Sequence, residues 1–295
     1  MKKGNVYKSE HGEKVLIELY DRQLKSLNVE YEDLYVQTRF GQSHLLKFGN
    51  PNGKPILIFH GGNSTTPFYL LFTGFKMLSE DFCIYAVDTI GHPGKSAQTI
   101  LSAKSMEYGE WAADIIDGLG FEKIICIGGS FGGGVLVKLM CFAPEKIEKA
   151  VLLVPSGIAN VSTFNLRSMI IPMIFYILTK KDYWLKKAIL PMAVDEKNID
   201  AVSYEMVKSS FEYVQVKVGM PSNVKTEQLE KCAAPTFIIA AEKDCMFPGK
   251  KVIERAEKIL PNVKTHLLQN QGHMVRLSVN DMNMIIKFID DKSKK

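Results

Sequence analysis

The chain has 295 residues, of which 46% are hydrophobic and 23% charged, and its formal net charge is +5. This ordinary globular composition excludes a disordered chain, a collagen-like repeat and a small disulfide-stapled scaffold. Only 5 of the 37 cations are arginines, and the lysines are dispersed between acids along the chain. We therefore expect no nucleic-acid binding, and we interpret the positive charge as a solubility feature.

Several features indicate a cytoplasmic protein. The lysines near the N-terminus are not followed by the apolar stretch of a secretory signal. The five cysteines are odd in number, unclustered and without a C-x-x-C pair, which favours a reducing compartment. The longest apolar run, 169–178, falls short of the roughly 18 residues that a membrane span requires. We expect no cofactor, no metal and no integral membrane segment.

The apolar pattern predicts a mostly parallel, doubly wound α/β sheet. An amphipathic helix over 14–27 precedes a hairpin formed by 35–40 and 44–48. From Pro55 onward, short continuous apolar runs alternate with amphipathic segments, as a sheet covered on both faces requires. The expected strands are 56–59, 83–87, 124–127, 150–154, 236–240 and 266–268, and the expected helices are 103–119, 131–142, 250–260 and 280–290.

One long segment interrupts this alternation. Residues 157–225 contain no obvious buried strand but hold apolar helical pieces at 169–178, 183–190 and 202–218. We interpret the segment as a helical cap inserted between two strands, over the carboxyl edge of the sheet. The expected organisation is therefore a core in two parts, 1–156 and 226–295, with a cap over 157–225.

The sequence GGSFG at 128–132 matches the G-x-S-x-G pattern of a nucleophile elbow. It follows an apolar strand and opens a helix, which is the context that this turn needs. Small residues on both sides of Ser130 allow the strained backbone and the close approach of helix to strand. The competing interpretation is a glycine-rich turn that binds phosphate at a helix N-terminus. The segment lacks the lysine or glycine spacing of such loops.

A serine nucleophile needs a general base, and His273 is the expected one. It follows the strand around 266–268 and precedes the last helix, so its loop should lie over the sheet edge. His92, in a loop after an early strand, is the alternative base. We expect the other histidines to lie on the surface (His11, His44) or to be structural (His60, His266).

The base in turn needs an acid that holds its tautomer. Asp244 lies in a loop at the carboxyl end of the strand 236–240, and Pro248 closes that loop. Glu242, two residues earlier, is the competing candidate. We favour Asp244 because of its place in the loop, and interpret Glu242 as an exposed charge.

An oxyanion hole requires fixed N–H donors beside the nucleophile. One expected donor is the backbone of Phe131, the residue after the serine. The other is the backbone of Gly62 in the loop HGGN at 60–63, with Asn63 as a second candidate. Glycine lets the backbone approach a substrate without a Cβ clash.

These motifs occur in the order typical of the α/β-hydrolase superfamily, which the chain resembles over nearly its whole length. The segments YDRQL (20–24), YVQTRFGQSHLL (35–46) and AVDTIGHPGKS (86–96) also resemble the bacillar carboxylesterase NP group. That group comprises cytoplasmic serine esterases that cleave aryl-propionate esters, with Glu as the acid where this chain has Asp244. The resemblance implies an α/β-hydrolase fold, a catalytic triad of Ser130, Asp244 and His273, and an oxyanion hole from Gly62 and Phe131.

Together these features predict a serine hydrolase that cleaves the carboxylic ester of an apolar small molecule through an acyl-enzyme. The alternatives are a ligand-binding or signalling protein on the same fold, a thioesterase, aminopeptidase or C–C hydrolase, and a cap that docks on membranes. We expect Asn63, Phe175 and Trp184 to bind substrate. Further apolar cap side chains could line the pocket: Phe164, Met169, Met173, Tyr176, Met206, Phe211 and Tyr213.

Overall fold

The computed structural model describes residues 5–162, 166–215 and 218–291. Eight strands form one sheet in the order β1-β2-β4-β3-β5-β6-β7-β8. The first two strands pair antiparallel, β2 also pairs antiparallel with β4, and the other neighbours are parallel. The predicted fold class, a mostly parallel α/β sheet, is thus confirmed. The strands are β1 (Tyr31–Thr38), β2 (Gly41–Gly49), β3 (Pro55–Phe59), β4 (Cys83–Val87), β5 (Ile124–Gly129), β6 (Ile147–Leu153), β7 (Thr236–Ala241) and β8 (Val263–Leu268).

Helices cover both faces of this sheet, which explains the unbroken apolar strands. In β3, Leu57 and Phe59 face a core with α3 (Glu107–Gly118), α4 (Phe131–Phe142), α8 (Thr226–Leu229) and α9 (Gly249–Ile259). The alternate residues Ile56 and Ile58 face a second core with α1 (Glu10–Leu27), α2 (Thr66–Thr73) and α10 (Val279–Asp290). Successive side chains of a strand point to opposite faces, so both sets must be apolar here.

Local capping sets several helix ends that apolar periodicity alone does not locate. The predicted helix 14–27 begins earlier, at Glu10, because the Ser9 side chain accepts a hydrogen bond from the Gly12 N–H. It ends at Leu27, and the next residue, Asn28, adopts the left-handed conformation. A capping box between Ser278 and Asp281 starts α10. Short 3-10 helices at 75–80, 144–146 and 196–198 complete the connections.

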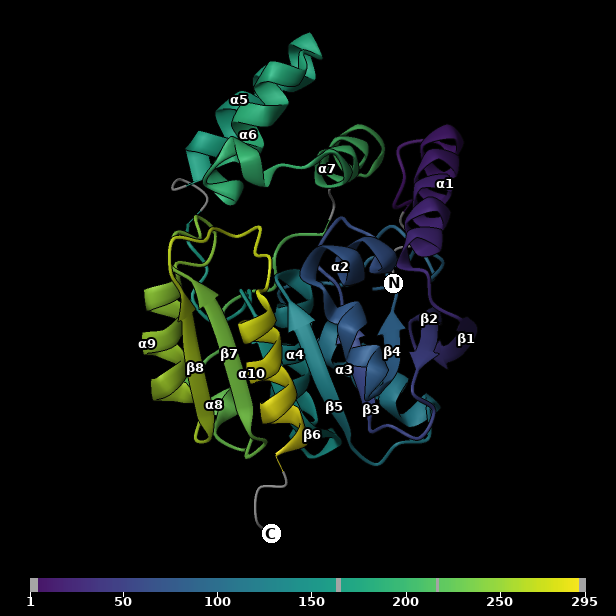
Figure 1. Ribbon diagram of the computed structural model, residues 1–295, viewed down its shortest axis with the longest axis vertical. Helices are drawn as coiled ribbons and strands as arrows, with labels where there is room; N and C mark the ends of the chain where they lie inside the picture. The colour runs from purple at the N-terminus through teal and green to yellow at the C-terminus, as the bar shows by residue number, and fades with distance from the viewer. Residues whose placement is uncertain (1–4, 163–165, 216–217, 292–295) are drawn as a thin grey trace.

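Between β6 and β7 the chain forms α5 (Arg167–Thr179), α6 (Asp182–Ala193) and α7 (Ala201–Tyr213). Figure 1 shows these three helices beyond the carboxyl ends of the strands. An apolar cluster that includes Tyr176, Leu185 and Ile189 joins α5 to α6. None of the helices in the described part of the chain has the length and apolarity that a bilayer span requires.

The N-terminal segment joins α7 to the core. Tyr7 forms an isolated antiparallel bridge with Val214. Its hydroxyl lies 3.3 Å from the carbonyl oxygen of Gly94, in the loop after β4. Farther along the chain, α1 packs on both α2 and α7. The segment 5–27 therefore connects α7 to the loops at the carboxyl edge of the sheet.

His44 is buried rather than exposed, so the expectation of a surface position is wrong. Its Nδ1 lies 2.8 Å from Asp88 Oδ2 and its Nε2 lies 2.7 Å from Asp33 Oδ1. The ring is covered because the loop after β4 folds back onto β2, where Ser96 Oγ accepts a hydrogen bond from the His44 N–H. In an alternating strand, polar character alone does not show which positions a later loop will cover.

These contacts shift the pKa values of both partners. Burial lowers the pKa of His44, but the carboxylates of Asp88 and Asp33 outweigh it, so the net shift is upward. Burial raises the pKa of Asp88, but the hydrogen bond and charge of His44 and the Lys95 N–H outweigh it, so that pKa falls. His44 therefore contributes its full stability below the ordinary histidine pKa of about 6.5 and loses it as pH rises through the raised value. Asp88 contributes fully above about 4 and loses its share as pH falls through the lowered value.

We expect His44→Gln to lower the free energy of unfolding by about 3 kcal/mol near pH 6, because it leaves Asp88 buried without its cation. The deficit should shrink as pH rises through the raised pKa of His44. Urea unfolding across the pH range measures this, with the exposed residue His11 changed to Gln as the control. A His44→Gln deficit that stays constant with pH would contradict the assignment of a charged His44.

Candidate active site

Ser130 lies at a sharp turn between β5 and α4. Its φ of 51° and ψ of −115° place the residue in the left-handed half of backbone space, where a side chain is strained. Two hydrogen bonds join this turn to the end of β6 and the loop after it. The Ser130 N–H donates to the Leu153 carbonyl at 2.9 Å, and the Ser156 N–H donates to the Ser130 carbonyl at 3.0 Å. The strain thus directs the hydroxyl outward at a fixed position.

Two glycines let α4 begin this close to the sheet. A Cβ on Gly132 would lie 2.2 Å from the Phe59 carbonyl oxygen at the end of β3. A Cβ on Gly128 would lie 2.4 Å from the Gly132 carbonyl oxygen. Both contacts are with backbone atoms, which cannot move aside easily. The G-x-S-x-G pattern here is therefore a packing requirement of the turn.

The structure brings Ser130, His273 and Asp244 together from three loops at the carboxyl edge of the sheet. Ser130 Oγ lies 2.9 Å from His273 Nε2, and His273 Nδ1 lies 2.8 Å from Asp244 Oδ2. The second carboxylate oxygen, Asp244 Oδ1, accepts hydrogen bonds from the N–H groups of Met246 and Phe247 at 2.7 and 2.9 Å. Because a carboxylate only accepts, this arrangement favours the tautomer with the proton on Nδ1, which leaves Nε2 free to accept from the serine.

The alternative acid and base make other contacts. Glu242 accepts a hydrogen bond from the Asn270 N–H at 3.0 Å and lies 3.9 Å from Lys250 Nζ. His92 is buried, with its ring 4.3 Å from that of Phe131. The pKa of His92 is lowered to about 3, mainly because the ring is buried and secondly because His60 lies nearby. A group of that pKa is a weak proton acceptor at neutral pH.

His60 fixes the loop that follows β3. Its Nε2 accepts a hydrogen bond from the Thr89 N–H at 2.9 Å, and its Nδ1 lies 2.7 Å from the Gly61 carbonyl oxygen. The Ser64 hydroxyl donates to the same carbonyl oxygen at 2.8 Å. These bonds fix the peptide group between Gly61 and Gly62, so the Gly62 N–H is held in one position.

Gly62 and Phe131 lie side by side next to the serine. A Cβ on Gly62 would lie 3.1 Å from Phe131 Cβ. Phe131 is the first residue of α4, where the N–H has no partner within the helix. The helix N-terminus also carries partial positive charge, which favours an anion beside Ser130. Both backbones can therefore present donors to the same oxygen.

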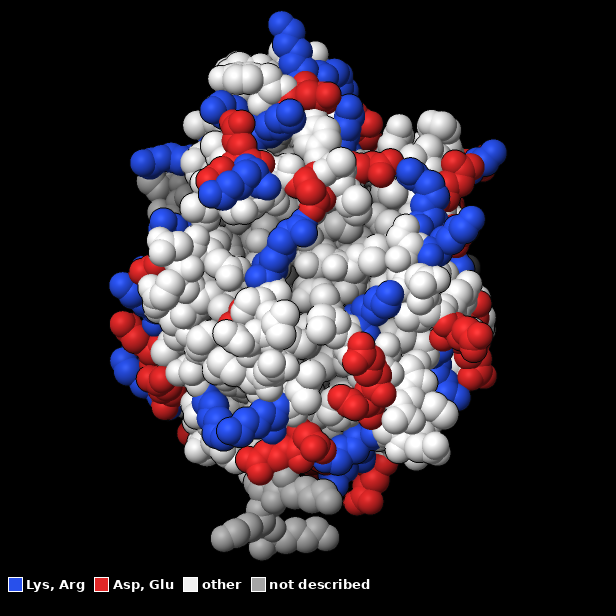
Figure 2. Space-filling model, in the orientation of Figure 1, with Lys and Arg blue, Asp and Glu red and all other residues white. Residues whose placement is uncertain are grey.

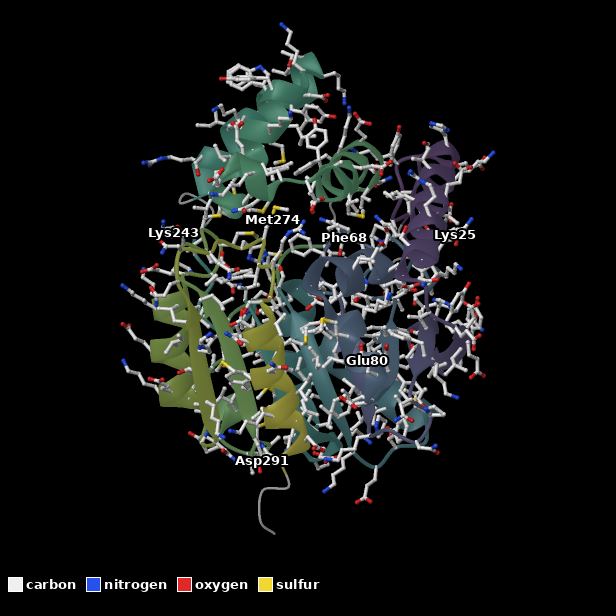
Figure 3. All side chains as sticks on the ribbon, viewed as in Figure 1. Lys25, Phe68, Glu80, Lys243, Met274 and Asp291 are labelled. Atoms are coloured by element: carbon white, nitrogen blue, oxygen red, sulfur yellow. The ribbon has the colours of Figure 1, made fainter. Side chains whose placement is uncertain are left out.

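A cavity of about 310 Å³ opens over Ser130 and His273. Six of its lining residues are methionines, three from α5, α6 and α7 and three from loops. Phe68 of α2 and Met274 of the loop after β8 lie between the sheet and the cap helices (Figure 3). The apolar side chains that line the cavity are Phe68, Phe72, Phe131, Leu153, Val154, Met169, Met192, Met206, Val207, Phe211, Val218, Met220, Met246, Met274 and Val275.

The expected substrate-binding residues are only partly found at this cavity. Asn63 lines it, but Phe175 and Trp184 do not. The centroids of those two rings lie 4.7 Å apart in a stacked arrangement, and Phe175 is 43% exposed. The two side chains therefore pack α5 against α6 and do not lie at the cavity, where substrate contact was expected. Helical spacing in a cap does not show which face turns inward. Met169, Met206 and Phe211 line the cavity as expected, and Phe164 lies outside the described residues.

Sequence reasoning missed Tyr69, which also lines the cavity. Its hydroxyl is buried and has no hydrogen-bond partner among the described residues. A Cβ on Gly129, the residue before Ser130, would lie 2.0 Å from that oxygen. The tyrosine thus fills the space that a side chain at position 129 would occupy. Gly129 itself was the available sequence signal, but a glycine does not show which distant side chain lies against it.

We expect Gly129→Ala to destabilise the fold by about 1–3 kcal/mol, because the new methyl group overlaps the Tyr69 hydroxyl. Tyr69→Phe alone should cost little, since it removes an unpaired buried hydroxyl. The double variant should recover part of the Gly129→Ala loss, because the overlapping oxygen is gone. Urea unfolding of the four proteins measures this coupling. Strictly additive losses would show that the two residues do not compete for this space.

Known proteins share this architecture. A family model described as the α/β hydrolase fold matches residues 54–183. Carboxylesterase YbfK of Bacillus subtilis is 25% identical over 276 residues, covering 88% of this chain and 87% of that protein. The uncharacterised carboxylesterase nap of the same organism is 23% identical over 266 residues, covering 88% and 86%.

A solved structure extends the likeness to the whole molecule. The crystal structure of naproxen esterase (carboxylesterase NP) from Bacillus subtilis superimposes with a TM-score of 0.80. The match has 20% sequence identity and covers 96% of this chain and 100% of that one. It includes the cap helices as well as the sheet. The chain therefore has the α/β-hydrolase fold, and it is similar to bacillar carboxylesterases over most of its length.

Proposed function

We propose that the chain is a serine carboxylesterase that cleaves esters of bulky apolar acids through an acyl-enzyme. The observation that carries this proposal is the continuous chain of contacts from Ser130 Oγ through His273 to Asp244, at the base of a methionine-rich cavity. The likeness to carboxylesterases over most of the chain supports the same activity.

In the first half-reaction, Ser130 Oγ attacks the ester carbonyl while His273 Nε2 takes the hydroxyl proton. Asp244 holds the imidazole and stabilises the positive charge that forms on it. The N–H groups of Gly62 and Phe131 stabilise the oxyanion. His273 then gives its proton to the leaving alcohol, and the acyl group stays on Ser130.

In the second half-reaction, a water molecule takes the place of the departed alcohol. His273 removes a proton from the water as it attacks the acyl-enzyme carbonyl. The same oxyanion donors act again, and the proton on His273 returns to Ser130 Oγ as the acid leaves. No step requires a cofactor, because each proton moves between the two side chains and the reactants.

The cavity wall supports a tolerant preference for apolar acyl groups. Methionine side chains are unbranched and adapt to ligands of different shape. One similar protein is named for naproxen, and we propose an acid of that bulk here. All five cysteines are free thiols, and this supports a reducing, cytoplasmic compartment.

We expect purified protein to hydrolyse p-nitrophenyl esters and to react with a fluorophosphonate probe at Ser130. Ser130→Ala should lower kcat by about 10⁶-fold and abolish labelling, because the nucleophile is gone. Rates over a series of acyl groups, together with mass spectrometry of the labelled peptide, measure both. Wild-type protein without turnover above the alanine variant would favour a ligand-binding protein on this fold.

Asp244→Asn should lower kcat by about 10⁴-fold with the fold intact, because an amide can donate to His273 and favour the wrong tautomer. Glu242→Gln is the matched control, since Gln can still accept from the Asn270 N–H and makes no contact with the base. Thermal unfolding verifies that both variants fold. If Glu242→Gln lowered kcat more than Asp244→Asn did, the acid of the triad would be Glu242.

A further inference from the structure

The α5–α6 hairpin (167–193) concentrates exposed apolar side chains. Among the described residues, it holds six of the thirteen large apolar side chains that are exposed. The most exposed of these is Leu178 at 73%, followed by Tyr183 at 58% and Ile177 at 56%. These residues lie next to the turn between the two helices. Apolar groups gathered in this way indicate an interaction surface rather than ordinary surface scatter.

The same hairpin carries most of the chain's net charge. It has five cations and one acid, a net charge of +4 against +5 for the whole chain. Lys180 and Lys181 form the turn beside Leu178, and Lys186 follows one helical turn later. The one acid, Asp182, lies 3.0 Å from Lys208 of α7, which offsets its charge. The apolar end is therefore bordered by positive charge.

The hairpin is placed so that this end can reach another surface. Figure 1 shows α5 and α6 projecting away from the sheet, and Figure 2 shows Lys and Arg side chains over that end of the molecule. At the opposite ends of the two helices, Met169 and Met192 line the cavity above Ser130. The hairpin thus joins the outer surface to the wall of the cavity.

We propose that the outer end of the α5–α6 hairpin docks on the surface of an anionic phospholipid membrane. Apolar side chains would enter the acyl boundary, while the flanking lysines bind lipid phosphates. At 13 residues, α5 is about 20 Å long, too short to cross the bilayer and suited to lying in its interface. A second copy fits less well, because two hairpins packed about a two-fold axis bring like charges together.

This inference is independent of the proposed esterase activity, and its test measures binding alone. The intact protein is sedimented with vesicles of phosphatidylcholine, with or without phosphatidylglycerol. We expect binding to the anionic vesicles and much less to the neutral ones, with release at high salt. The Lys180→Glu, Lys181→Glu double variant should bind at least tenfold more weakly, since each lysine near an anionic surface contributes about fivefold.

Leu178→Asp tests the apolar part and should also lower binding at least tenfold. The matched controls lie elsewhere on the surface: Val279→Asp at a residue that is 65% exposed, and Lys231→Glu with Lys258→Glu on exposed positions of the core. These controls should bind anionic vesicles nearly as well as wild type. Circular dichroism melting verifies that every variant folds.

Three results would overturn the proposal. The first is absence of wild-type binding to every vesicle, and the second is hairpin variants that bind no worse than the controls. The third is a dimer in light scattering that Leu178→Asp converts to a monomer, which would assign the surface to a second copy. None of these results bears on ester hydrolysis, so the two proposals stand or fall separately.

Discussion

The close approach of α4 to the ends of β3 and β5 is the constraint on which the site depends. With no Cβ at Gly128 or Gly132, helix and strand backbones come within a distance that any larger residue would prevent. That approach forces the strained turn at Ser130 and places the Phe131 N–H against Gly62. These two close backbone contacts therefore determine the positions of Ser130, the expected nucleophile, and of the expected oxyanion donors.

The parallel strands bring the remaining groups to the same edge. β7 ends just before Asp244, and β8 ends shortly before His273, so adjacent strands bring the expected acid and base side by side. Two backbone N–H groups hold the acid in place, and His60 holds the loop opposite. Each reactive group is thus fixed by backbone hydrogen bonds or by rigid turns. This limits the reorganisation that a reaction here would require.

The α5–α6 hairpin combines exposed apolar side chains with an excess of positive charge. Along the chain, lysines alternate with acids and the excess of five looks evenly spread. In the folded protein, the acid of the α5–α6 hairpin lies beside Lys208, Lys180 and Lys181 follow Leu178 at the turn, and Lys187 Nζ lies over the exposed Tyr183 ring. The excess positive charge is therefore concentrated on the hairpin that also exposes the most large apolar side chains among the described residues. The other ends of the same helices supply methionines to the cavity, so one element serves both surfaces.

Apolar runs and glycine spacing were sufficient to predict the sheet, because a strand buried on both faces leaves an unbroken apolar signal. They also identified Ser130, His273 and Asp244 as residues that would lie together, since the ends of parallel strands share one edge. Three features could not be predicted from the sequence: the burial of His44, the stacking of Phe175 on Trp184, and the contact of Tyr69 with Gly129. Each depends on which face a helix or loop presents to a distant partner. Local periodicity determines that an element has an apolar face, and only tertiary packing decides what that face touches.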